Sequence, residues 1–152
     1  MKKLFLDSNI IIDALSKERP EHQEARLLLA LGAAGEFELW TSPSQWTDLF
    51  YILTQGGRRV LADGVKGILR EVRRVVRVCV IGESEIDAAL VSPWTDFEDA
   101  AVYQCAVTVS SRAIITRNQE DFAPSIIPVF SCSEFFAWME ENEGIAYAEL
   151  GR

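Results

Sequence analysis

Carboxylates stand near the ends of several short apolar runs, and they are the residues best able to do chemistry in this sequence. Asp7 directly follows the apolar residues 4–6. The other candidates lie further along the chain, at Asp48, Asp96, Glu98, Asp99 and Asp121. Because a carboxylate at the end of a buried strand must find polar partners, Asp7 is the hardest to explain as ordinary surface. Carboxylates that gather without a nucleophile or a histidine base favour a hard ion held by oxygen, Mg²⁺ or Mn²⁺.

Hydrolysis of a phosphodiester is the reaction class that such an ion predicts. The ion lowers the pKa of a bound water, holds a phosphate oxygen and neutralises charge during an in-line displacement. The chain has only one histidine, His22, so RNA cleavage by a pair of histidines is excluded. His22 lies in a polar segment that is expected to be at the surface. It has no G-x-S-x-G elbow, no phosphate-binding loop of the P-loop type and no G-x-G-x-x-G.

Each acid after Asp7 also has an ordinary structural interpretation. Asp96 is a good helix N-cap, and Glu98 and Asp99 are favoured in a first helical turn by the helix dipole. Asp48 lies off the apolar stripe of its predicted helix, as a solvated residue would. Asp121 could simply cap a turn. What favours a shared site is the joint placement, with about one acid for each strand-to-helix connection.

The elements that must position these acids alternate along the chain, without a linker, a repeat or a low-complexity segment. Strands are expected at residues 3–6, 37–42, 75–81, 113–116 and 127–130. Helices are expected at 9–17, 21–35, 42–57, over the basic stretch from 58, at 83–91, at 96–111 and from 131. This order predicts an α/β fold with a mainly parallel sheet of four to five strands, covered on both faces. Sites in such sheets form beyond the carboxyl ends of the strands.

Length and composition predict one domain over residues 1–152, because the chain has 152 residues and is 49% hydrophobic. No apolar run is long enough for a membrane span, so we expect a soluble cytoplasmic protein. The cysteines, Cys79, Cys105 and Cys132, are odd in number and lie in apolar contexts. They are therefore expected to be reduced thiols rather than a disulfide framework or a zinc site.

Charge is unevenly distributed. From Arg58 to Arg77 the chain has seven basic residues and two acids, a net charge of +5 within a chain of net charge −8, so the rest carries −13. Four of these cations, Lys66, Arg70, Arg73 and Arg77, recur at helical spacing. Such a row could follow an RNA backbone, although it could equally be a solvated helix face whose arginines pair with acids elsewhere.

Four segments, in this order, resemble the PIN-domain ribonucleases, and in particular the VapC-like toxins of prokaryotic toxin–antitoxin pairs: FLDSNIIIDAL, TSPSQWTDLFYIL, DFEDAAVYQCA and IITRNQEDF. The resemblance implies a three-layer α/β/α sandwich and a Mg²⁺- or Mn²⁺-dependent endoribonuclease that acts on RNA. It also implies a homodimer and a partner antitoxin.

The resemblance assigns roles residue by residue. Asp7 and Asp99 match family acids and would be direct metal ligands. Asp48 stands where many members have Glu, and as the shorter side chain it could bind through water. Asn118 stands where Asp is common, and Asp121 could supply the missing charge. Supporting residues are expected at Asn9, Asp96, Thr116 and Asn118, and Arg117 is expected to contact phosphate.

Two departures, Asp48 and Asn118, leave a second hypothesis open. A site with less negative charge would hold one metal well and a second only with substrate. The chain could then be a PIN-fold module that binds RNA or a protein and has lost efficient catalysis. A third hypothesis, a phosphatase with Asp7 as nucleophile, is weaker because Asn9 stands where that chemistry usually has a second acid.

Overall fold

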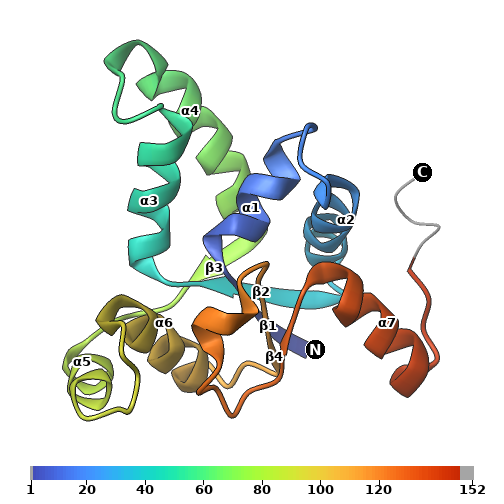
Figure 1. Cartoon of the computed structure of the whole chain (residues 1–152). Helices are drawn as coiled ribbons and strands as arrows, with labels where there is room; N and C mark the ends of the chain where they lie inside the picture. Colours follow the sequence, from blue (N-terminus) through green and yellow to red (C-terminus); the bar gives the residue numbers. More distant parts are fainter. Residues whose placement is uncertain (1, 148–152) are drawn as a thin grey trace.

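A computed structural model describes residues 2–147 and shows a five-stranded parallel sheet in the order β3-β2-β1-β4-β5 (Figure 1). The strands are β1 (Lys2–Leu6), β2 (Phe37–Thr41), β3 (Val76–Val78), β4 (Ala113–Ile115) and β5 (Val129–Phe130). Central β1 pairs with β2 on one side and β4 on the other, where Phe5 lies opposite Trp40 and Ile114. The predicted parallel sheet is confirmed, and its strands all end at one edge.

Helices cover both faces of the sheet, so the expected three-layer α/β/α sandwich is confirmed. One face is covered by α1 (Ser8–Leu15), α2 (His22–Ala33), α3 (Pro43–Leu53), α4 (Arg59–Arg73) and α7 (Cys132–Glu143). The other is covered by α6 (Phe97–Thr108) and the 3₁₀ turn η1 (Gln119–Phe122), and α5 (Glu83–Leu90) packs against α6. Side chains alternate along β1. Leu4 and Leu6 therefore join the hydrophobic core on the first of these faces, and Phe5 joins the second core, on the other face.

Local signals in the sequence set the starts of the helices at the carboxyl edge. Asp7 caps α1 by accepting a hydrogen bond from the backbone N–H of Ser8, and Asp96 caps α6 by accepting from that of Asp99. Pro43 stands in the first turn of α3, where its missing N–H costs nothing. The acids that were predicted to do chemistry are therefore also the residues that begin two of the helices.

Two glycines near the end of α2 are explained by different structural requirements. Gly35 has a φ of +84°, the left-handed backbone that the turn into β2 requires. Gly32 lies inside α2, where an added Cβ would be 2.5 Å from Leu39 Cδ1. Close packing of the helix on the sheet therefore explains Gly32.

The basic stretch does not form one continuous helix. Helix α4 ends at Arg73, and Arg77 lies in strand β3, where its guanidinium packs 5.7 Å from the centre of the Trp40 ring. Arg77 therefore lies within the strand expected at residues 75–81, and the row of cations at helical spacing does not extend to it. The β-branched residues 75, 76 and 78 favour a strand over another helical turn.

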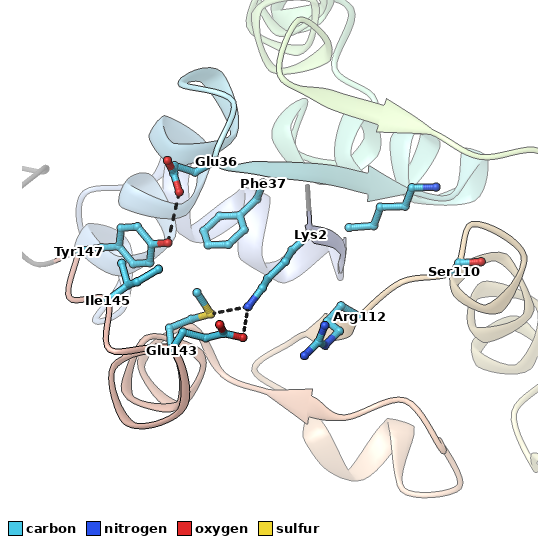
Figure 2. A pocket seen from close by; sticks show the side chains of 10 residues that line it. Lys2, Glu36, Phe37, Ser110, Arg112, Glu143, Ile145 and Tyr147 are labelled. Atoms are coloured by element: carbon cyan, nitrogen blue, oxygen red, sulfur yellow. Dashed lines mark hydrogen bonds and ion pairs between the residues drawn. The ribbon is translucent and has the colours of Figure 1, made fainter.

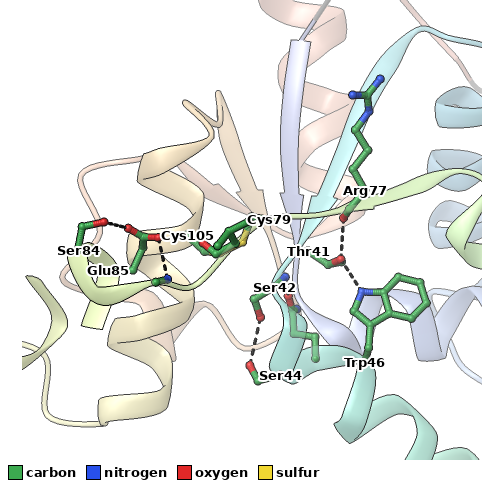
Figure 3. Close-up of a disulfide and its surroundings, with 12 residues drawn as sticks. Thr41, Ser42, Ser44, Trp46, Arg77, Cys79, Ser84, Glu85 and Cys105 are labelled. Carbon is green, nitrogen blue, oxygen red and sulfur yellow. Dashed lines mark hydrogen bonds between the residues drawn. A yellow bond between two sulfur atoms is a disulfide. The ribbon is translucent and has the colours of Figure 1, made fainter. Parts of the chain in front are cut away.

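The expectation of three reduced thiols was also wrong, because a disulfide joins Cys79 and Cys105 (Figure 3). Cys79 follows β3 and Cys105 lies in α6, and their Cα atoms are 6.3 Å apart, within the usual range for a disulfide. The two residues are 26 positions apart and meet only through the βα crossover. Cys132 is free and buried, and burial raises the pKa of its thiol to about 12.

The amino edge of the sheet, opposite the carboxyl edge where the predicted acids lie, carries a cavity lined by both polar and apolar residues. Figure 2 shows this cavity from close by. Lys2 Nζ there pairs with Glu143 Oε1 at 2.5 Å, and Arg112 also lines the cavity. Among the residues that the structure describes, no helix is both long enough and apolar enough to cross a membrane.

Candidate active site

Polar side chains gather where β1 and β4 end next to each other. Asp7 follows β1, and Thr116 follows β4 and is fully buried. Thr116 Oγ1 donates a 2.7 Å hydrogen bond to Asp7 Oδ2, and the backbone N–H of Ser8 donates a 2.8 Å bond to Asp7 Oδ1. Asp7 is thus held at the edge of the sheet from two directions.

Asn9 lies beside Asp7 and Thr116 and links them by hydrogen bonds. Its Nδ2 lies 3.3 Å from Asp7 Oδ2 and 3.4 Å from Thr116 Oγ1, and its Oδ1 accepts from the backbone N–H of Arg117 at 3.3 Å. The backbone N–H of Asn118 also donates to Thr116 Oγ1, at 3.0 Å. One small network therefore joins the start of α1 to the turn after β4.

The first turn of α6 brings more acids to this edge. The Asp96 carboxylate accepts from the backbone N–H of Asp99 at 2.8 Å, so the N-cap interpretation of Asp96 is confirmed. Burial, together with the charges of Asp96, Asp121 and Asp7, raises the pKa of Asp99 to about 6. Asp99 therefore lies within the field of acids from the start of its own helix and from two other segments, at Asp7 and Asp121.

Asp48 and Asp121 complete the cluster from α3 and η1. Asp48 is exposed, off the apolar stripe, and it contacts the carboxyl of Glu98. Burial, followed by the charge of Asp48 and this contact, raises the pKa of Glu98. Asp121 is exposed in η1, and its charge acts on both Asp7 and Asp99.

The pKa of Asp7 is raised as well, and it reflects some causes that raise it and others that lower it. Burial raises it most, and the charge of Asp121 adds to this effect. The hydrogen bonds from Thr116 and Ser8 favour the ionised form and lower the pKa. A carboxylate kept partly desolvated but supplied with donors is typical of a ligand or an acid–base group.

We define the acid cluster as six residues: Asp7, Asp48, Asp96, Glu98, Asp99 and Asp121. None of them forms an ion pair with a lysine or arginine within residues 2–147. Within the same range, no three acidic, histidine or cysteine side chains converge closely enough to hold a metal ion. The cluster is therefore a region of uncompensated negative charge rather than a preformed coordination cage.

The basic residues predicted to bind RNA separate into three places. Lys66, Arg70 and Arg73 line a cavity of about 270 Å³ with Trp46 and Leu69, between α3 and α4. Arg77 lies on β3 as described above, with its Nε 4.0 Å from Glu38. Arg117 lies beside the cluster, but its Nε forms a 2.6 Å ion pair with Asp13.

Two buried polar residues near the site were not found by sequence reasoning. Asp13 is 0% exposed, and Gln45 uses its side chain to donate to the carbonyl of Leu6 at 2.7 Å and to accept from Ser42 N at 2.6 Å. A signal for Asp13 was present: it lies three residues after Ile10, on the buried face of α1. An acid on that face needs a buried partner.

Two aromatic residues near α6 differ in their surroundings. Trp94 stacks on Tyr103 with ring centres 4.7 Å apart and belongs to the second core, so core packing explains it. Phe97 is 47% exposed, next to the acids of α6. His22 is half-buried, and its Nδ1 donates to the carbonyl of Asp13 at 2.8 Å. This hydrogen bond involves none of the acids in the cluster.

Comparisons with known proteins agree with this fold. The PIN domain family model matches residues 3–120. Ribonuclease VapC1 of Aquifex aeolicus (strain VF5) is 24% identical over 140 residues, which cover 88% of this chain and 93% of that protein. A toxin–antitoxin complex from Klebsiella pneumoniae contains a chain with a TM-score of 0.61 and 21% identity, covering 85% of this chain and 97% of that one.

A third similar protein is Mycobacterium tuberculosis VapC20, described as a sarcin–ricin loop cleaving toxin. Its structure aligns with a TM-score of 0.54 and 18% identity, over 73% of this chain and 86% of that one. The family model spans most of the chain, including Asp7 after β1, Asp48 in α3 and Asp99 in the first turn of α6. The chain therefore belongs to the PIN domain family.

Proposed function

We propose that this protein is a metal-dependent endoribonuclease and the toxin of a toxin–antitoxin pair. The observation that carries the proposal is the acid cluster, in which burial and the charges of carboxylates from four segments raise the pKa of Asp7, Glu98 and Asp99, and no member has a cationic partner among residues 2–147. Membership of the PIN domain family and the similarity to a VapC ribonuclease support the same function.

The donor set fits Mg²⁺ or Mn²⁺. Both ions prefer carboxylate oxygen, and a divalent charge would relieve the repulsion that, in addition to burial, raises the pKa of Asp99 and Glu98. Because the acids do not converge as they stand, binding requires exposed side chains such as Asp48 and Asp121 to turn toward the ion. We assign Asp7 and Asp99 as direct ligands, with Asp121 contributing charge and Asp48 acting through water.

When bound, the ion would supply an activated water and charge neutralisation at a phosphate. Residues of the chain orient the side chains that would hold the ion. Thr116 and Asn9 orient Asp7 through hydrogen bonds to its Oδ2. Asp96 fixes the first turn of α6 and with it the backbone of Asp99. Hydrolysis of this kind should leave a 5′-phosphate and a 3′-hydroxyl, and one metal should bind well, with a second only when substrate is present.

The similarity to a toxin–antitoxin complex supports a proposal about the partners of this chain. The Klebsiella neighbour is a toxin–antitoxin complex, and we propose that this chain too is neutralised by an antitoxin and works in the cytoplasm as a homodimer. We propose that RNA contacts the cavity lined by Lys66, Arg70 and Arg73, since salt-sensitive contacts to phosphate need a surface of clustered cations.

Cleavage of a total RNA pool by purified protein tests the nuclease proposal. With Mg²⁺ or Mn²⁺ we expect discrete fragments with 5′-phosphate ends, and with EDTA we expect intact RNA. Asp7→Asn should abolish cleavage while leaving the circular dichroism spectrum unchanged. Cleavage that persists in this variant at the wild-type rate would refute the assignment.

The second candidate is a PIN-fold module that binds RNA or a protein without efficient catalysis. Asp48 and Asn118, which replace the residues common in the family, favour it, as does the absence of converged acids within residues 2–147. Intact RNA in every condition, from folded protein free of antitoxin and with RNA binding retained, would support this module instead.

A further inference from the structure

We propose that Asp13 is a positioning residue of the active site. By holding Arg117, it fixes the turn of residues 116–121 against α1, so that the polar groups of this turn face Asp7. The part of the proposal that concerns metal affinity rests on the proposed function, but the part that concerns the turn does not.

The contact between Asp13 and Arg117 is a buried ion pair. Asp13 is 0% exposed, its Oδ2 lies 2.6 Å from Arg117 Nε, and the Arg117 side chain is 28% exposed. Asp13 Oδ1 has no hydrogen-bond partner within the part of the chain that the structure describes. A buried carboxylate is costly unless it is paired, so Asp13 constrains strongly where Arg117 can lie.

Arg117 is held to α1 at a second point as well. Its backbone N–H donates to Asn9 Oδ1 at 3.3 Å, while Asn9 Nδ2 reaches Asp7 Oδ2. Asn9 and Asp13 lie one turn of α1 apart. Two attachments to one helix fix both the position and the direction of the chain at Arg117.

This attachment reaches the acid cluster through the turn itself. The backbone N–H of Asn118 donates to Thr116 Oγ1 at 3.0 Å, and that of Asp121 donates to the carbonyl of Asn118 at 3.0 Å. Thr116 in turn donates to Asp7. The hydroxyl that orients Asp7 and the carboxylate of Asp121 therefore depend on the path of the chain that Arg117 sets.

The outer side of the turn is only partly supported, through Gln119, whose Nε2 donates to Glu134 Oε2 at 2.8 Å and to the carbonyl of Val129 at 3.4 Å. A cavity of about 570 Å³ lies between the turn and the start of α7, lined among others by Asp13, Arg117, Asn118, Gln119, Ser131 and Glu134. The inner side is better anchored, because the carbonyl of Asp13 accepts from His22 Nδ1 at 2.8 Å and ties the end of α1 to α2. The ion pair thus connects a well-anchored helix to a turn with open space beside it.

Amide hydrogen exchange of the metal-free protein tests the proposal directly. Asp13→Asn keeps the shape of the side chain and removes its charge, so we expect the amides of residues 117, 118 and 121 to exchange at least about tenfold faster. The amides of β1 should change much less. The matched control is Glu143→Gln, which breaks the Lys2–Glu143 pair at the opposite edge and should leave the turn unchanged.

A double variant keeps the test valid if Asp13→Asn alone folds poorly. Asp13→Asn with Arg117→Gln replaces the ion pair by two neutral amides, leaves no buried unpaired charge, and should slow exchange of the turn again. Turn exchange in Asp13→Asn that equals the wild-type rate would overturn the proposal, as would an increase that is uniform over the chain.

Calorimetric titration with Mn²⁺ then separates positioning from mere stability. Removal of supporting contacts around a metal site typically costs about 10–100-fold in affinity, so we expect Asp13→Asn to bind Mn²⁺ correspondingly more weakly and the double variant to recover most of the loss. Faster turn exchange with unchanged Mn²⁺ affinity would overturn the link to the metal site. Faster exchange in a protein whose wild type binds no Mn²⁺ would support the positioning of the turn and contradict the proposed function.

Discussion

Thr116 Oγ1 donates a 2.7 Å hydrogen bond to Asp7 Oδ2, and this bond joins the carboxyl ends of β1 and β4. It is the largest of the effects that lower the pKa of Asp7, whereas burial raises it. Because the hydroxyl favours the ionised carboxylate, Thr116 offsets part of the effect of burial and favours the form of Asp7 that can bind a metal ion.

Replacement of this hydroxyl should therefore weaken metal binding. Thr116→Val keeps the volume and removes the donor, so the pKa of Asp7 should rise further and the loss of Mn²⁺ binding on acidification should begin at a higher pH. Loss of the buried hydrogen bond should lower the free energy of unfolding by about 1–2 kcal/mol. Calorimetric titration at several pH values and urea unfolding measure both effects. Thr116→Ser retains the hydroxyl and should behave as wild type; an identical pH profile for the valine variant would contradict the role of the bond.

Asp99 should reduce the stability of the metal-free protein at neutral pH. Its pKa is raised to about 6 in the folded state from 3.8, so the folded protein binds this proton more tightly than the unfolded chain. The stability contributed by the protonated group is present below about pH 4 and is lost as the pH rises through about 6. Asp99→Asn should thus stabilise the protein at pH 7.5, by on the order of 1 kcal/mol after allowance for solvent screening.

Urea unfolding between pH 5 and 8 checks this sign. The difference between Asp99→Asn and wild type should shrink as the pH falls through 6. Asp63→Asn removes an exposed acid from α4 and serves as the control, with no comparable gain. A variant that is less stable than wild type at pH 7.5 would contradict the repulsion within the cluster.

The Cys79–Cys105 disulfide should contribute measurably to stability. For cysteines 26 residues apart, loss of loop entropy in the unfolded chain corresponds to about 3.5 kcal/mol in the chain-entropy model. Thermal unfolding with and without dithiothreitol should show a large decrease in Tm on reduction. Thiol titration of the unfolded, unreduced protein should give one free cysteine, Cys132; three free thiols would contradict the pairing.

The cations of the cavity between α3 and α4 should contribute to RNA binding. Replacement of Lys66, Arg70 and Arg73 by Gln should reduce the slope of log K against log salt by about 2, since each contact to single-stranded phosphate contributes about 0.7. Binding is measured in the Asp7→Asn background so that RNA stays intact.

A matched triple variant distinguishes this cavity from the general charge of the segment. Arg58, Arg59 and Arg74 lie in the same basic stretch but do not line the cavity. Their replacement by Gln removes an equal charge and should change the slope much less. Equal effects of the two triples would show that the location of the cations does not matter.

Much of the site could be predicted because strand ends and helix starts have local signals. An apolar run that ends in Asp7, and an acid in the first turn of α6, place their carboxylates at one edge once the sheet is parallel. Periodicity in α3 correctly placed Asp48 away from the core. These features depend on a few neighbouring residues, which a single sequence contains.

Features that depend on distant contacts could not be predicted in the same way. The disulfide forms because β3 and α6 meet, and Gly32 lies inside α2 because Leu39 of β2 approaches it. Arg117 seemed free to contact phosphate until the structure paired it with Asp13, which is 104 residues away in sequence. No local pattern encodes such pairs, although the acid on the buried face of α1 was a usable warning.

Titration with Mn²⁺ tests most directly whether the acid cluster is a metal centre. Calorimetry of the wild type should show binding at micromolar to millimolar Mn²⁺, Asp99→Asn should weaken it by at least about tenfold, and Asp63→Asn should leave it unchanged. Absence of binding at millimolar Mn²⁺, or equal affinity in wild type and Asp99→Asn, would contradict the metal centre.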